Sequence, residues 1–215
     1  MNIVENFNKI INQIKSLNTK RNINVIVVTK TFDLNYISPI IDIGHAHFGE
    51  NRVQEALDKW SKIKVKDRKN KLHLIGRLQS NKVKDACRIF DYIHSLDSEK
   101  LASKISAEQN ITKKSVKLFI QVNFGNEAQK SGIQVSEVDS FVKLCISKYK
   151  LDIIGLMCIP PANQDPIPYF RLLKELALNN GLSELSMGMS GDYLKAIACG
   201  SSYVRIGSAI FGKRN

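Results

Sequence analysis

Short apolar runs alternate with segments of helical spacing along nearly the whole chain. Several runs are continuous in Val, Ile and Leu, which is typical of parallel strands covered on both faces. Eight such runs lie at 23–28, 45–48, 72–75, 92–94, 116–122, 151–159, 185–187 and 203–206. Apolar residues that recur every three to four positions predict helices between them, among them 53–62, 81–90, 138–149 and 169–178.

Strands that alternate with helices are typical of right-handed βαβ units and a parallel sheet. Eight strands favour closure into a single (β/α)8 barrel of the TIM type. The alternative is an open doubly wound sheet, but no GxGxxG follows an early strand. Residues 1–20 have a helical period in Ile3, Phe7 and Ile10, so we predict an additional N-terminal helix. The 215 residues fit one domain, 1–215.

Composition restricts the cellular setting. No stretch reaches the roughly 18–20 apolar residues of a membrane span, and Glu5 interrupts the apolar residues at the N-terminus. We therefore expect a cytoplasmic protein without a membrane partner. The four cysteines lie far apart and form no CxxC pair, so we interpret them as reduced small hydrophobes and expect no metal site.

The net charge of +12 raises the question of an anionic partner. The lysines are dispersed, and their local clusters at 59–71 and 113–117 lie between the periodic segments. No RNA-binding aromatic pattern or zinc finger accompanies them. We interpret the clusters as solvated faces and loops, and we expect no nucleic-acid partner.

Polar and glycine-rich residues follow the predicted strands, at the end where TIM barrels build their sites. The first run ends in Val27-Val28-Thr29-Lys30. A lysine that leaves an apolar strand can be desolvated, which lowers its pKa and frees the amine to condense with an aldehyde. The alternative is a lysine whose stem lies along the strand end while its ammonium reaches solvent.

The loops after the last two strands predict an anion site. Ser190 and Gly191 open a predicted helix at 191–199, and Gly207 and Ser208 follow the eighth strand. The loops after strands seven and eight recur as the phosphate site of this fold, and the first amides of a helix suit an anion. The alternative is that Ser190 only caps a helix and Gly207 only forms a turn.

Three further polar residues need partners. Arg205 lies inside an apolar strand, so it requires a ligand acceptor or a carboxylate such as Glu50 or Asp192. Asn51 follows the second strand, where it would donate to an oxygen of a bound ring or cap the next helix. His73 lies in an apolar run, and we interpret it as a hydrogen-bonded core histidine.

Together these segments resemble a known family. The motifs are VTKT, FGENRVQEALDK, LHLIGRLQSNK, IQVN, KSGI, GLMCIPP, SMGMSGD and VRIGSAIFG, and they run from residue 25 to residue 212. They resemble the small pyridoxal 5′-phosphate-binding proteins known as YggS, or as PLP homeostasis protein (PROSC) in animals. That family is similar to the N-terminal domain of bacterial alanine racemase and consists of one barrel.

The resemblance implies the cofactor and the roles of the rim residues. Lys30 would hold pyridoxal 5′-phosphate as a Schiff base, Arg205 would face the pyridine nitrogen, and Asn51 would lie beside the ring. The phosphate would be bound by Ser190, Gly191, Gly207 and Ser208. Family members bind the cofactor without established turnover and are thought to keep free PLP and amino-acid pools in balance. Apo PLP-dependent enzymes are the partners that this role suggests.

The chain departs from the family pattern at three places. The family often has a second lysine two residues after the Schiff-base lysine, but Phe32 stands there and offers no amine for a relay of the cofactor. The frequent Glu-Asn-Ser-Lys-Ser-Gly is Glu-Ala-Gln-Lys-Ser-Gly at 127–132, so Lys130 is kept. The loop 163–168 is short. The sequence assigns no role to Lys82 or Lys130.

A rival function is a PLP-dependent racemase or lyase that acts on amino acids. Racemases of the related fold use a second domain that supplies a catalytic base to a partner subunit, whereas this chain ends soon after its eighth strand. We therefore expect a monomeric binding protein with no catalytic residue. The sequence does not distinguish delivery, buffering and sensing of the cofactor.

Overall fold

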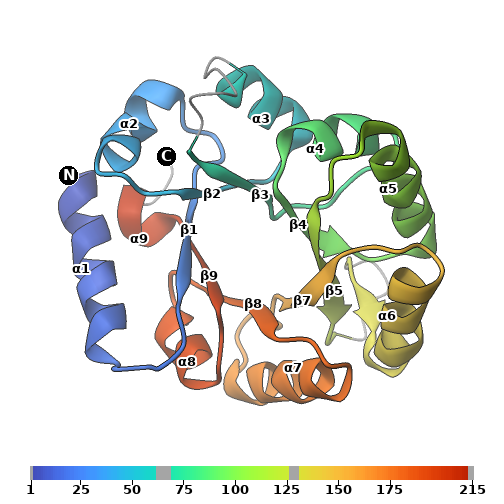
Figure 1. The fold of residues 1–215 in the computed structure, drawn as a ribbon. Coiled ribbons are helices and arrows are strands. Elements are labelled where there is room, and N and C mark those ends of the chain that lie inside the picture. The colour runs from blue at the N-terminus through green and yellow to red at the C-terminus, as the bar shows by residue number, and fades with distance from the viewer. Residues whose placement is uncertain (1, 62–68, 126–130, 213–215) are drawn as a thin grey trace.

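The computed structural model describes residues 2–61, 69–125 and 131–212, and it contains a closed ring of eight parallel strands (Figure 1). Neighbouring strands pair in the order β4-β3-β2-β1-β9-β8-β7-β5, and β5 pairs again with β4. The strands are β1 (Asn24–Val28), β2 (His47–Glu50), β3 (Lys71–Leu74), β4 (Tyr92–Leu96), β5 (Lys117–Asn123), β7 (Ile153–Cys158), β8 (Glu184–Met189) and β9 (Tyr203–Ile206). The two-residue β6 (Ile133–Gln134) pairs beside β5, outside the ring. The predicted (β/α)8 barrel is confirmed.

Helices surround the strands (Figure 1). They are α1 (Ile3–Ser16), α2 (Leu34–Asp42), α3 (Val53–Trp60), α4 (Val83–Ile89), α5 (Glu99–Thr112), α6 (Val138–Ser147), α7 (Ile167–Asn179), α8 (Tyr193–Ala198) and α9 (Ser208–Phe211). The extra N-terminal helix is present as α1. The helix predicted at 191–199 begins at Tyr193 instead, because the Asp192 carboxylate accepts from the Met189 amide, 2.6 Å away, and holds a turn before it.

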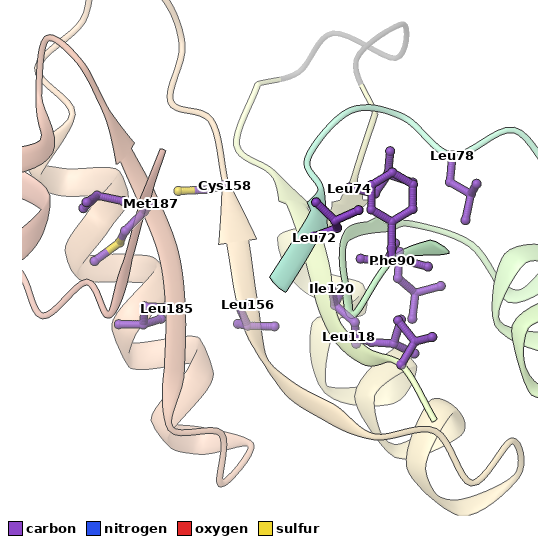
Figure 2. Packing of buried hydrophobic residues seen from close by; sticks show 14 of the residues in the cluster. Leu72, Leu74, Leu78, Phe90, Leu118, Ile120, Leu156, Cys158, Leu185 and Met187 are labelled. Atoms are coloured by element: carbon purple, nitrogen blue, oxygen red, sulfur yellow. The ribbon is translucent and has the colours of Figure 1, made fainter. Parts of the chain in front are cut away.

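Side chains alternate between two packing layers along the strands. Those that face outward meet the helices, and Figure 2 shows pairs of them two residues apart on single strands: Leu118 and Ile120 on β5, Leu156 and Cys158 on β7, and Leu185 and Met187 on β8. The inner layer is a separate cluster of Ile26, Tyr92, Phe119, Met157 and Tyr203. This period of two explains why the strands read as continuous apolar runs: both faces are buried.

Helix α1 ties the beginning of the chain to its last helix. The Asn2 side chain caps α1 by accepting from the Glu5 amide at 3.2 Å. Phe7 is buried from the next turn, and Asn6 donates from Nδ2 to the Ile210 carbonyl at 3.0 Å. Since Ile210 belongs to α9, α1 supports the short helix that follows the last strand.

Candidate functional site

Four strands that neighbour one another in the ring bring the predicted site residues together. The order is β2, β1, β9, β8. Their carboxyl ends lead into Asn51, Lys30, the pair 207–208 and the pair 190–191 respectively. All strands are parallel, so these ends lie on one rim of the barrel. The predicted residues therefore form one arc of that rim, although Lys30 and Ser208 lie 178 positions apart in the sequence.

A buried ion pair holds the loop that carries Lys30. The Glu50 Oε1 atom accepts from Thr29 Oγ1 at 2.7 Å, from Lys59 Nζ at 2.8 Å and from Trp60 Nε1 at 3.0 Å. Lys59 also donates to the Thr29 carbonyl at 2.7 Å. Lys59 is 7% exposed and Glu50 is not exposed at all. The backbone immediately before Lys30 is thus fixed by charge-assisted hydrogen bonds.

This ion pair corrects one sequence interpretation. The sequence predicts that Lys59 is solvated with the other lysines at 59–71, yet Lys59 points inward from α3, between the helix and the strands. Residues 62–68 of that cluster lie outside the described residues. Glu55, one helical turn before Lys59, accepts from Lys59 at 3.3 Å and from the Thr31 amide. The sequence contains a signal for this ion pair: Glu50 stands at a strand end, and Glu55 and Lys59 follow on one face of the next helix.

Phe32, which stands where the family often has a second lysine, packs in an aromatic cluster. Its ring stacks on Tyr36 with the centroids 5.0 Å apart, and its centroid lies 4.7 Å from that of Phe211. Phe211 belongs to α9, which begins beside the pair 207–208. Phe32 therefore links the Lys30 loop to the helix after β9.

The loops after β8 and β9 meet through one side chain. Ser190 Oγ accepts from the Gly207 amide at 3.3 Å and from the Ala209 amide at 3.2 Å. Two backbone donors of one loop thus converge on a single oxygen of the other. Gly207 has φ −127°, so its backbone does not require glycine. Close approach favours it, because an added Cβ would lie 3.3 Å from Val28 Cβ, a tight contact.

Arg205 points into the barrel and is 4% exposed. It donates from Nη1 to the Ser186 carbonyl and to Ser186 Oγ, both at 2.7 Å, and from Nη2 to the Cys158 carbonyl at 2.8 Å. Among the described residues it forms no ion pair with either predicted partner, because Glu50 faces Lys59 on α3 and Asp192 lies beyond salt-bridge distance. Burial lowers the pKa of Arg205, and the nearby Cys158 and Asp192 partly oppose this.

Asn51 lines a cavity at the barrel mouth and does not cap the next helix. The N-cap of α3 is Arg52, and no side chain caps that helix. Glycine is needed at position 76, since a Cβ there would overlap the backbone of Asn51. The cavity measures about 360 Å³, and its lining mixes polar side chains with apolar surface: Asn51, Arg77, Gln121, Asn123 and Ser131 contribute, with Ile75, Gly76, Val122, Ile159 and Pro160.

The remaining candidates lie elsewhere or cannot be placed. His73 is fully buried and hydrogen-bonded, as predicted. Lys82 is half-buried at the start of α4. Lys130, with 127–129, lies outside the described residues. Across the described part of the chain, no group of three or more His, Cys, Asp or Glu is placed to hold a metal ion, and no helix is long and apolar enough to cross a membrane.

Comparison with known proteins assigns the chain to a family. Residues 3–215 match the family model for the alanine racemase N-terminal domain. The chain is 35% identical to the pyridoxal phosphate homeostasis protein of Haemophilus influenzae, with 100% of this chain and 97% of that protein covered. It is 34% identical to the homologue of the same name in Escherichia coli K12, with 90% and 86% covered. The chain belongs to the pyridoxal phosphate homeostasis protein family. The resemblance predicted from its motifs is confirmed.

Solved structures of this family have the same barrel. PipY of Synechococcus elongatus with PLP bound matches with a TM-score of 0.86 and 31% identity, over 98% of this chain and all of that one. An alanine racemase of Clostridium difficile matches with a TM-score of 0.78 at 13% identity, and this chain spans 57% of its length. That second likeness shows a shared fold. The family assignment rests on the homeostasis proteins.

Proposed function

We propose that this protein binds pyridoxal 5′-phosphate as a homeostasis protein, holding it as a Schiff base on Lys30 without committed catalytic turnover. The observation that carries the proposal is the arc at the carboxyl ends of β2, β1, β9 and β8. The arc contains a lysine, an asparagine and two amide-bearing loops, and the buried Arg205 precedes one of these loops on β9. Relatives of the chain are named for PLP homeostasis, and PipY was solved with PLP bound.

The donor set fits the chemistry of the cofactor. When bound, pyridoxal 5′-phosphate supplies an aldehyde that condenses with an amine and a ring that can withdraw electrons. Ser190 Oγ accepts from the amides of Gly207 and Ala209, and a phosphate oxygen that took its place would accept from the same two donors. We assign the phosphate to the pairs 190–191 and 207–208, and the ring edge to Asn51.

Arg205 would limit how strongly a bound cofactor withdraws electrons. Its guanidinium stays charged and offers only donors. Facing the ring nitrogen, it would donate to the unprotonated form and disfavour the protonated form, which is the stronger electron sink. PLP enzymes instead tune the ring nitrogen with a partner such as an acidic residue. Arg205 would thus disfavour reactions that depend on a protonated ring nitrogen.

The attachment to Lys30 is tested by borohydride reduction of the purified protein in the presence of PLP. We expect mass spectrometry to find the phosphopyridoxyl group on the peptide that contains Lys30, together with loss of the visible absorption of the Schiff base. Lys30→Ala should lose the adduct completely while keeping the fold. An adduct confined to Lys82 or Lys130 would overturn the assignment.

Absence of turnover is tested with L-alanine in deuterated water. We expect the α-carbon to keep its configuration after prolonged incubation with the PLP-loaded protein. An authentic alanine racemase serves as the positive control. Formation of D-alanine at ordinary enzymatic rates, about 1–1000 per second, would favour the racemase.

We also propose that the protein acts in the cytoplasm as a monomer, with apo PLP-dependent enzymes as recipients of the cofactor. Four unpaired cysteines suit a reducing compartment. Three of them are buried, and burial raises the pKa of the Cys158 thiol to about 12. Such thiols are unreactive.

A further inference from the structure

All four histidines of the sequence lie at the barrel, and three of them form a continuous line across its interior. His47 Nδ1 lies 2.9 Å from His73 Nε2, and His73 Nδ1 lies 2.9 Å from His94 Nε2. We call these three residues the histidine chain. Its inner end reaches Ser186, whose Oγ is 2.8 Å from His94 Nδ1 and accepts from Arg205 Nη1 at 2.7 Å. The line therefore joins the amino-terminal rim of the barrel to Arg205.

The direction of these hydrogen bonds follows from Arg205. A guanidinium only donates, so Ser186 Oγ accepts from it. Among the described residues the hydroxyl proton of Ser186 has one recorded acceptor, His94 Nδ1. A neutral imidazole that accepts at Nδ1 carries its proton at Nε2 and donates there.

The same rule applies to the rest of the histidine chain. His94 donates from Nε2 to His73 Nδ1, so His73 donates from Nε2 to His47 Nδ1. Every bond then points from Arg205 toward the amino-terminal rim. If His94 carried its proton at Nδ1, the Ser186 hydroxyl would have no acceptor for its own proton. The Nε2–H tautomer is therefore favoured at His94 and, through the hydrogen bonds, along the histidine chain.

The surroundings keep the two inner rings neutral and fixed. His73 stacks on Tyr92 and His94 stacks on Phe119, each with ring centroids 4.2 Å apart. Both histidines are fully buried, and burial lowers the pKa of each well below the ordinary value, with further lowering of the pKa of His94 by Arg205. Neutral, stacked imidazoles transmit hydrogen-bond direction without carrying charge into the core.

We propose that Ser186 and the histidine chain are positioning residues that fix the orientation of the Arg205 guanidinium. Ser186 Oγ accepts a hydrogen bond from Arg205. Its own hydroxyl proton is hydrogen-bonded at the same time only when His94 Nδ1 accepts it. That Arg205 in turn faces the ring nitrogen of the cofactor rests on the function proposed above. The hydrogen bonds of the histidine chain are formed within the protein and do not depend on a bound cofactor.

The first test uses cofactor-free protein labelled with nitrogen-15 in its histidines. Long-range proton–nitrogen spectra at neutral pH should show His73 and His94 each as a single Nε2–H tautomer. Ser186→Ala should introduce the Nδ1–H form at His94 and also at His73, which does not contact residue 186.

Two variants control this measurement. Ser186→Thr keeps the hydroxyl and should restore the single tautomer. Ser201→Ala removes another buried hydroxyl, bonded to the Met187 carbonyl at 2.8 Å, and should leave both histidines unchanged. If His73 and His94 of the wild type carried the proton at Nδ1, or were a mixture of tautomers, the inference would be wrong, and this result does not need a folded Ser186→Ala variant. Identical histidine spectra of wild type and Ser186→Ala would also overturn it.

The second test uses PLP labelled with nitrogen-15 in its ring. Ser186→Ala should shift the ring-nitrogen signal toward the protonated form, and Ser186→Thr should reverse the shift. An unchanged ring signal, with altered histidine tautomers, would contradict the positioning role. Failure of the cofactor to attach to Lys30 would instead refute the proposed function, and the cofactor-free spectra would still decide on the histidine chain.

Discussion

Lys59→Met is expected to lower the free energy of unfolding by about 3–5 kcal/mol, the usual cost of removing one partner from a buried ion pair. The Glu50 carboxylate would stay buried without its ammonium partner, and the Thr29 carbonyl would keep only the Phe32 amide as a donor. Urea denaturation of wild type and variant measures the difference. Because Thr29 precedes Lys30, the variant should also bind the cofactor less tightly.

Two variants separate the charge effect from a general effect of the substitution. Lys9→Met replaces an exposed lysine on α1 and should stay within about 0.5 kcal/mol of wild type. Adding Glu50→Gln to Lys59→Met removes the unpaired charge but keeps an acceptor for Thr29 and Trp60, so it should recover part of the lost stability. If the free energy of unfolding of Lys59→Met lay within about 1 kcal/mol of the wild-type value, the ion pair would contribute little to stability.

Gly207→Leu is expected to weaken PLP binding at least tenfold, or about 1.4 kcal/mol, and to affect pyridoxal far less. The new Cβ would lie 3.3 Å from Val28 Cβ and 3.4 Å from the Val28 carbonyl, and the rest of the leucine side chain adds bulk there, so we expect the loop after β9 to shift away from β1. That shift would displace the amides of Gly207 and Ala209 from the proposed phosphate site. Pyridoxal has no phosphate, so it does not use these donors.

The comparison needs a control for added bulk in the same region. Ala198→Leu places the same side chain on an exposed position at the end of α8 and should change neither affinity. Fluorescence or absorbance titration gives the ratio of variant to wild-type affinity for PLP and the same ratio for pyridoxal. Equal weakening of PLP and pyridoxal would show that this loop does not bind the phosphate.

The sequence by itself determined the architecture and the rim. Eight apolar runs alternating with helical segments predicted the barrel, because burial on both faces of a parallel strand leaves a local pattern of Val, Ile and Leu. Strand ends are local as well, so the sequence predicts Lys30, Asn51 and the two final loops as rim residues, and it predicts Arg205 from a charge inside an apolar run. The ring order β2, β1, β9, β8 then brought them together.

Only the tertiary structure decided which polar side chains meet in the interior. Glu50 was a predicted partner of Arg205 but turns outward to Lys59, since successive residues of a strand face opposite sides. The histidine chain joins β2, β3 and β4 to β8, and the shear of the closed barrel sets that register. Such pairings depend on strand stagger and closure, which local periodicity does not encode. For that reason the sequence predicted a core histidine at 73, and the fold supplied its partners.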